Sequence, residues 1–103
     1  MTIRVVLSPQ VRDFLQSLAP DPRRRLSRAL KALAQGEGDI KQLDGKLARY
    51  ARLRVDQMRV IFDRSAAPGD RRVVCFYAGY RATVYSVLEQ LLASGLIEQL
   101  KRN

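Results

Sequence analysis

Hydrophobic and polar positions along the chain change their period several times, and each change predicts a new element. Residues 3–7 alternate loosely, with Ile3, Val5 and Leu7 set apart from Arg4, so a first strand is expected there. The spacing then becomes helical, and from Lys46 onward it returns to a period of two. The pattern therefore predicts a chain that mixes helices and strands.

Two helical segments follow the first strand. Ser8 and Pro9 are typical of the N-cap and first position of a helix, and Asp21 and Pro22 repeat that signal. The apolar stripes run through Val11, Phe14, Leu15 and Leu18 in the first segment and through Leu26, Ala29, Leu30 and Leu33 in the second. The segment "QGEGD" ends the second helix. The short connection "APDP" predicts a helical hairpin.

Three further strands are expected over roughly residues 47–55, 58–64 and 71–78, with the loop "RSAAPGDR" between the last two. The third of these is almost continuously apolar, which favours a central strand covered on both faces. The segment "AGYRAT" is expected to be a loop that leads to a final helix with Thr83 at its N-cap. "SG" at 94–95 ends this helix, and the tail adds a further turn or two. The predicted order is β-α-α-β-β-β-α, an α+β fold with a helical hairpin packed on a mainly antiparallel, four-stranded sheet.

The segment Tyr50–Phe62 reads as a hairpin with a two-residue turn at Asp56 and Gln57. Counting outward in pairs sets Arg54 opposite Arg59. Leu53, Val55, Met58, Val60 and Phe62 share one face, and Arg52, Arg54 and Arg59 share the other. Like charges directly opposite each other destabilise a strand pair. The cluster of Arg52, Arg54 and Arg59 is therefore expected to bind an anion.

Composition narrows the class of protein. The 103 residues suggest one domain, and 47% hydrophobic residues indicate a globular protein with a modest core. No secretory leader or membrane span is expected, and the single Cys75, which we expect to be a core thiol, fits a reducing cytoplasm. The net charge is +9, and the window 45–81 holds nine basic and three acidic residues. A basic patch of this kind favours nucleic acid as partner over a merely solubilising surface.

The segment "GYRATVY" at 79–85 adds Arg81, in a loop, and Tyr85, in the first turn of the last helix. Taken alone, an R-x-R strand is typical of a solvated face, and such a tyrosine is typical of the rim of a core. Together they suit phosphodiester chemistry, because guanidinium groups match phosphate oxygens and stabilise negative charge as it develops.

The order of elements, the hairpin "LDGKLARYARLRVDQMRVIFD" and the terminal "GYRATVY" resemble the RelE/ParE superfamily of bacterial type II toxins over nearly the whole chain. The resemblance implies a cognate antitoxin as partner. In its RelE-like branch it also implies cleavage of messenger RNA in the ribosomal A site, with contacts to 16S ribosomal RNA. The implied reaction is attack of a ribose 2′-hydroxyl on the adjacent phosphodiester. We expect no metal, no cofactor and no membrane partner.

Carried over by residue, the resemblance implies three catalytic residues, Arg59, Arg81 and Tyr85, with Tyr85 the candidate general base or a stacking group. It implies four RNA-binding residues, Arg52, Arg54, Lys46 and Arg49. The chain has no histidine, and arginine cannot act as a base where relatives have lysine. Two alternatives stay open: a ParE-like toxin that inhibits DNA gyrase by binding, without nuclease activity, and a basic binding domain whose activity has been lost.

Overall fold

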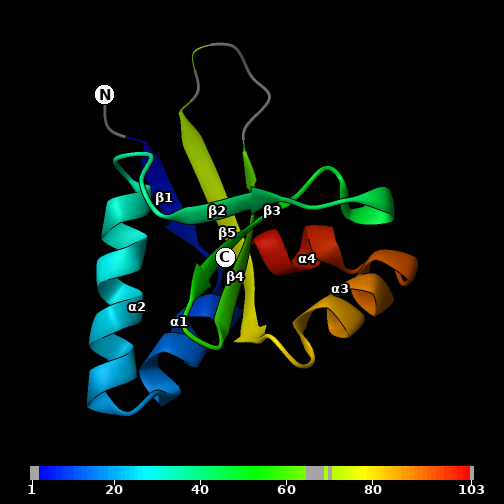
Figure 1. Ribbon diagram of the computed structural model, residues 1–103. Coiled ribbons are helices and arrows are strands. Elements are labelled where there is room, and N and C mark those ends of the chain that lie inside the picture. Colours follow the sequence, from blue (N-terminus) through cyan, green and yellow to red (C-terminus); the bar gives the residue numbers. More distant parts are fainter. Residues whose placement is uncertain (1–2, 65–68, 70, 103) are drawn as a thin grey trace.

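A five-stranded sheet lies between two pairs of helices in the computed structural model, which describes residues 3–64, 69 and 71–102 (Figure 1). The strands are β1 (Arg4–Leu7), β2 (Asp39–Gln42), β3 (Ala51–Val55), β4 (Met58–Arg64) and β5 (Arg72–Tyr80). The helices are α1 (Pro9–Ser17), α2 (Pro20–Leu33), α3 (Val84–Ala93) and α4 (Ile97–Lys101), with a short 3-10 helix, η1 (Gly45–Leu47), between β2 and β3.

The strand order is β1-β5-β4-β3-β2, with β1 parallel to β5 and every other pair antiparallel. This confirms an α+β fold with a helical hairpin on a mainly antiparallel sheet. The predicted count of four strands is wrong, because a further strand, β2, begins at Asp39, the last residue of the segment taken to end the second helix. Gly38 makes that entry possible: its φ is 133°, and a Cβ there would lie 2.8 Å from Leu53 Cδ1.

Polar side chains fix α1 against β5. The Ser8 hydroxyl accepts a hydrogen bond from the Val11 amide (3.2 Å) and donates one to the Phe76 carbonyl (3.0 Å), so the predicted N-cap also joins helix to sheet. Gln10 donates to the Ala78 carbonyl and accepts from the Ala78 amide, which continues the ladder beside β5 after β1 has ended.

The predicted start of α2 at Asp21 and Pro22 is wrong by two residues. The helix begins at Pro20, and Ala19 is the extended N-cap with ψ of 161°. The first proline of "APDP" already occupies a position near the helix start, and the residue before a proline favours an extended conformation. Asp21 therefore lies within the first turn, where its negative charge suits the helix dipole.

The β3–β4 hairpin has the predicted register: Val55 pairs with Met58, Arg54 with Arg59 and Leu53 with Val60. Asp56 adopts a φ of 56° at the turn, a left-handed conformation that aspartate tolerates better than most residues. The predicted start of β3 near residue 47 is wrong. Residues 45–50 instead form η1 and a turn, and the Gln42 side chain, at the end of β2, donates hydrogen bonds to the carbonyls of Ala48 and Tyr50 in this segment.

The strand β5 is central, as predicted, and runs two residues further than predicted, so "AGY" belongs to the sheet and the connecting turn begins at Arg81. The pairing of β4 with β5 shifts between Ile61 and Phe62, which places Phe76 and Tyr77 together against the α3 and α4 side. Residues 65–68 and 70 of the loop predicted between these strands lie outside the described residues.

The last helices follow the predicted limits. Thr83 is the N-cap residue of α3, without a side-chain hydrogen bond, and Gly95 has a φ of 70° just after the helix. The expected extra turn in the tail is α4. Among the described residues, no helix is long and apolar enough to cross a membrane.

Two apolar clusters lie on opposite sides of the sheet. The larger one joins α1 and α2 to Leu53, Val60 and Phe62, and it includes Cys75. Burial raises the pKa of the Cys75 thiol to about 12, as expected for a core residue. The smaller cluster joins α3 and α4 to Ile61 and Phe76. The arginine face of the hairpin lies on this second side, as the alternation of side chains along β3 and β4 requires.

Candidate functional site

Two rows of paired residues cross the sheet on the side of α3 and α4. One row is Lys41, Arg52, Ile61 and Tyr77, and the other is Asp39, Arg54, Arg59 and Gly79. Arg59 therefore lies between the like charge of Arg54 and a glycine that has no side chain. The sheet surface carries cations here, where the apolar cluster beneath α3 and α4 ends.

Arg59 is fixed by the backbone of its own turn. Its Nη1 donates to the carbonyls of Asp56 and Met58, each at 2.9 Å, and the residue is only 7% exposed. No carboxylate pairs with it among the described residues. Two neutral carbonyls therefore orient this buried guanidinium, with no carboxylate beside it in the described part of the chain.

Arg52 and Arg54 instead face a carboxylate on β2. Arg52 Nη1 donates to the Asp39 carbonyl (2.8 Å) and to its Oδ1 (3.0 Å), whereas Arg54 Nε lies 3.9 Å from Oδ2. The hydrogen bond from Arg52 lowers the pKa of Asp39 most, and the charges of Arg52, Arg54 and Arg59 add to the effect. Asp39 thus neutralises part of the arginine face.

A pocket of about 290 Å³ opens where the sheet meets the first turn of α3. Its lining residues are Lys41, Gln42, Leu43, Asp44, Arg52, Arg59 and Tyr85. Within the described part of the chain, no hydrogen bond or ion pair engages the side chains of Lys41, Asp44 or Tyr85. The pocket therefore combines the oriented guanidinium groups of Arg52 and Arg59 with three further groups. These are the phenol of Tyr85, the ammonium of Lys41 and the carboxylate of Asp44, and each of the three is available to a ligand.

The structure separates the other expected site residues from this pocket. Arg81 has an exposed side chain and does not line it, although the Arg81 amide donates to the Gln57 carbonyl (2.8 Å) and holds the turn against the hairpin tip. Lys46 lines a second hollow, between η1 and α3. Arg49 lies toward the other end of β4, where its Nε donates to Asp63 (3.1 Å).

Asp63 is the anchor of α4. Its carboxylate, in a residue only 9% exposed, also accepts a hydrogen bond from Lys101 at 2.8 Å. Burial of Lys101 opposes its charged form, but hydrogen bonds to Asp63 and Glu98 outweigh this and raise the pKa of Lys101 overall. The ammonium also lies 5.5 Å from the ring centroid of Tyr50. Arg49 therefore pairs with a carboxylate that also holds α4, at the boundary of the smaller cluster.

Sequence reasoning missed four lining residues, Lys41, Gln42, Leu43 and Asp44, because it missed β2. The available signal was the alternation of Asp39, Ile40 and Lys41 directly after two glycines. Within the described residues, no group of three histidine, cysteine, aspartate or glutamate side chains is placed to hold a metal ion.

No model of a known protein family matches the chain, and no curated protein matches it either. Among solved structures, the chain is similar to a chain of the toxin–antitoxin complex RelBE2 from Mycobacterium tuberculosis. The TM-score is 0.66 with 19% sequence identity, and the match covers 79% of this chain and 100% of that one. The chain therefore shares the fold of that chain. At this level of identity the likeness establishes the fold alone.

Proposed function

We propose that this protein is the toxin of a type II toxin–antitoxin pair and that it cleaves messenger RNA in the ribosomal A site. The observation that carries the proposal is the pocket in which Arg52 and Arg59 meet Tyr85 and Asp44. Cations that are fixed before the substrate arrives suit a reaction whose negative charge grows on phosphate oxygens. The RelE-like fold adds support, as do the net charge of +9 and the excess of nine basic over three acidic residues in the window 45–81.

In the proposed reaction the ribose 2′-oxygen forms a bond to phosphorus while the bond from phosphorus to the 5′-oxygen breaks. The products are a 2′,3′-cyclic phosphate and a 5′-hydroxyl. Arg59 and Arg52 bind the non-bridging oxygens of the scissile phosphate. Arg54 and Arg81, both more exposed, bind the flanking backbone.

Two protons move in this reaction, and arginine suits neither transfer. Asp44 supplies a carboxylate that accepts the proton of the 2′-hydroxyl. Tyr85, for which the resemblance implies a general base or a stacking group, is assigned here another role: its phenolic hydroxyl donates a proton to the departing 5′-oxygen. Both side chains line the pocket and have no partner within the described residues, so both are available to the substrate.

The proposal includes the partners of such a toxin. An antitoxin would cover the arginine face with acidic side chains, as Asp39 already does in part. The ribosome would align the message and would contact the basic surface of the protein through 16S ribosomal RNA. The protein would act in the cytoplasm.

The test is to induce the protein in bacterial cells, map RNA 5′ ends on translated messages, and probe for gyrase–DNA cleavage complexes in the same culture. New 5′-hydroxyl ends at A-site codons are expected. Trapped gyrase without such ends would contradict the proposal and support the ParE-like alternative, whereas the absence of both would favour a binding domain without activity.

A matched pair of variants links the activity to the pocket. Tyr85→Phe removes one hydroxyl from the pocket, and Tyr80→Phe removes the same group from a tyrosine that is 51% exposed and lies outside it. Cleavage should fall strongly in the first variant and stay unchanged in the second. Equal activity of both would show that the Tyr85 phenol takes no part.

A further inference from the structure

The turn of the β3–β4 hairpin connects the two sides of the sheet. At this turn Asp56 adopts a φ of 56°, and its carbonyl accepts one of the two hydrogen bonds that orient the Arg59 guanidinium, at 2.9 Å. The side chain of Asp56 instead contacts α2, where Arg25 Nε donates to its Oδ2 at 2.6 Å. Asp56 therefore joins a helix of the larger cluster to a guanidinium in the pocket on the other side of the sheet.

Two features of the hairpin act against this turn conformation. A left-handed φ is unfavourable for a residue with a Cβ, although aspartate tolerates it better than most. The pairing of Arg54 with Arg59 adds a repulsion between like charges next to the turn. The direction of the Asp56 carbonyl, and with it the position of the Arg59 guanidinium, therefore depends on contacts that hold the turn from outside the hairpin.

Each residue of the turn is held by a group from outside the hairpin. The Arg81 amide donates to the Gln57 carbonyl at 2.8 Å, and this is a backbone bond that most substitutions of Arg81 would retain. The contact to Asp56 is made by a side chain, that of Arg25. The turn thus has one support that belongs to the backbone and one that a single substitution on α2 removes.

We propose that Arg25 is a positioning residue for the cleavage reaction: through Asp56 it fixes the carbonyl that directs the Arg59 guanidinium to the scissile phosphate. The inference rests on the proposed nuclease function. The pair uses one donor, Nε, so a single N–H group suffices at Arg25, whereas Arg59 acts through its planar fork. Both partners are about half exposed, and pairs of this kind contribute little to overall stability. The effect of Arg25 is therefore expected on the rate of cleavage and not on folding.

The test measures single-turnover cleavage on programmed ribosomes at a series of protein concentrations, which gives a maximal rate and a half-saturating concentration. Arg25→Ala should lower the maximal rate about three- to fivefold, the scale of an exposed ion pair, and leave the half-saturating concentration unchanged. Arg25→Lys should restore the rate, because lysine supplies the one donor that the pair needs. Asp56→Gly suits a positive φ but removes the carboxylate, so it should lower the rate as Arg25→Ala does.

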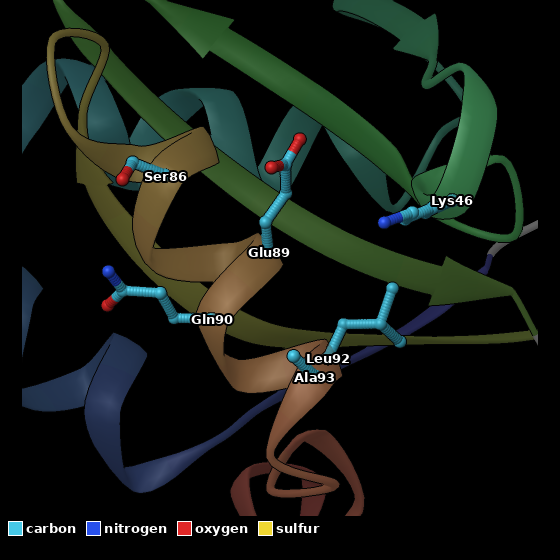
Figure 2. Close-up of a pocket in the computed structure, with 6 residues that line it drawn as sticks. All are labelled: Lys46, Ser86, Glu89, Gln90, Leu92 and Ala93. Atoms are coloured by element: carbon cyan, nitrogen blue, oxygen red, sulfur yellow. The ribbon is translucent and has the colours of Figure 1, made fainter.

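Two control variants lie on α2 and α3. Arg24→Ala is matched to Arg25→Ala, because Arg24 is the neighbouring residue and its exposed pair with Asp21 stays within α2. Gln90→Ala lies on the helix that carries Tyr85; Gln90 is exposed, and Figure 2 shows its side chain directed away from Lys46 and η1. Neither control should change the maximal rate.

Two further readouts separate positioning from a merely structural role. In the Arg59→Gln background, Arg25→Ala should cause no additional loss of rate, because the group that it positions is gone. The second readout is the NMR signal of the Arg59 guanidinium in the protein alone, assigned by its absence in Arg59→Gln. Rotation of this group should be slow in the wild type and in Arg24→Ala, and faster in Arg25→Ala.

The outcomes distinguish the inference from the nuclease function. If the wild type cleaves and Arg25→Ala changes neither the rate nor the Arg59 signal, the inference is overturned and the nuclease function stands. A full additional loss in the Arg59→Gln background, or a raised half-saturating concentration at an unchanged maximal rate, would make Arg25 a group that binds RNA itself and would also overturn the inference. If the wild type cleaves no message, the proposed function fails and the positioning role fails with it.

Discussion

The two sides of the sheet differ in how completely helices cover them. On the side of α1 and α2, the larger apolar cluster continues across the sheet and includes Leu53, Val60 and Phe62. On the side of α3 and α4, the cluster around Ile61 and Phe76 ends within the sheet, and the rest of the surface carries arginines. The first side contributes the larger part of the buried core that stabilises the fold. The second side leaves a rigid sheet accessible, and this is where a ligand can be bound without reorganising the fold.

Basic charge occurs on both sides, but it is held differently. On α2, Arg24 pairs with Asp21 and Arg25 with Asp56, while Arg28 and Lys31 are exposed. On the open side of the sheet, Arg52 and Arg59 are fixed by backbone carbonyls at the edge of a pocket. The comparison shows that the orientation of the cations distinguishes the candidate site from the basic helix, because the amount of charge is similar.

The largest effect is expected in the larger cluster. Phe62→Ala should lower the free energy of unfolding by about 3–5 kcal/mol, because Phe62 is fully buried and its truncation leaves a cavity. Denaturant unfolding followed by circular dichroism measures this loss. Tyr85→Phe, on the open side, is the comparison, and a similar loss in that variant would remove the distinction between the two sides.

The next effect concerns the rate of cleavage. Arg59→Lys keeps the charge but loses the planar fork of donors, so the rate should fall about 10²-fold, the usual consequence of losing one fixed donor to a developing anion. Single-turnover cleavage on programmed ribosomes measures it. Arg28→Lys is the control on α2, and an unchanged rate in Arg59→Lys would contradict the role given to this side chain.

A smaller effect is expected at the anchor of α4. Lys101→Met should cost about 1–3 kcal/mol of unfolding free energy at pH 7, since it removes a hydrogen bond to the nearly buried Asp63. The pKa of Lys101 is raised in the folded state, so its contribution is complete below the unfolded value of roughly 10.4 and is lost as the pH rises through the folded pKa. Urea titrations from pH 7 to 11 should show the wild type and variant converging only above this value. Convergence at lower pH would contradict the assignment.

The smallest effect concerns the carboxylate that shields the arginine face. Asp39→Asn should strengthen binding to short single-stranded RNA by about two- to fivefold, the scale of an exposed ion pair, with a steeper salt dependence. Asp13→Asn, on exposed α1, is the control for net charge. The pKa of Asp39 is lowered, so its stabilising contribution is present above roughly pH 3.9 and is lost as the pH falls through the folded value. Equal gains in the two variants would show that only overall charge matters.

Much of the architecture follows from local patterns. The register of the β3–β4 hairpin was predictable because a two-residue turn and strict alternation leave one pairing that buries Leu53 and Val60 together. The helices were predictable from the spacing of their apolar residues, and the start of α1 from Ser8 at its N-cap. By contrast, β2 is four residues long and mostly exposed, so its hydrophobic signal is weak. Its pairing with β3 and the packing of Ile40 against the larger cluster stabilise it as a strand.

The candidate site was only partly predictable for the same reason. Arg52 and Arg59 could be placed on one face from the alternation of the hairpin, and Tyr85 near them from the resemblance. Lys41 lies on β2 and Asp44 lies two residues beyond its end, so neither could be placed without that strand. Lys46 lines a hollow together with residues of α3, which depends on tertiary packing. Arg81 is close in sequence to Tyr85, but the turn directs its side chain outside the pocket, which sequence spacing alone does not reveal.

One measurement tests most directly whether oriented cations on the open side of the sheet carry the activity. Two double variants remove the same charge: Arg52→Gln with Arg59→Gln in the pocket, and Arg28→Gln with Lys31→Gln on α2. Single-turnover cleavage of a message on programmed ribosomes should fall at least about 10²-fold in the first and change only about two- to threefold in the second. An equal fall in both variants, or a full rate in the first, would contradict this account.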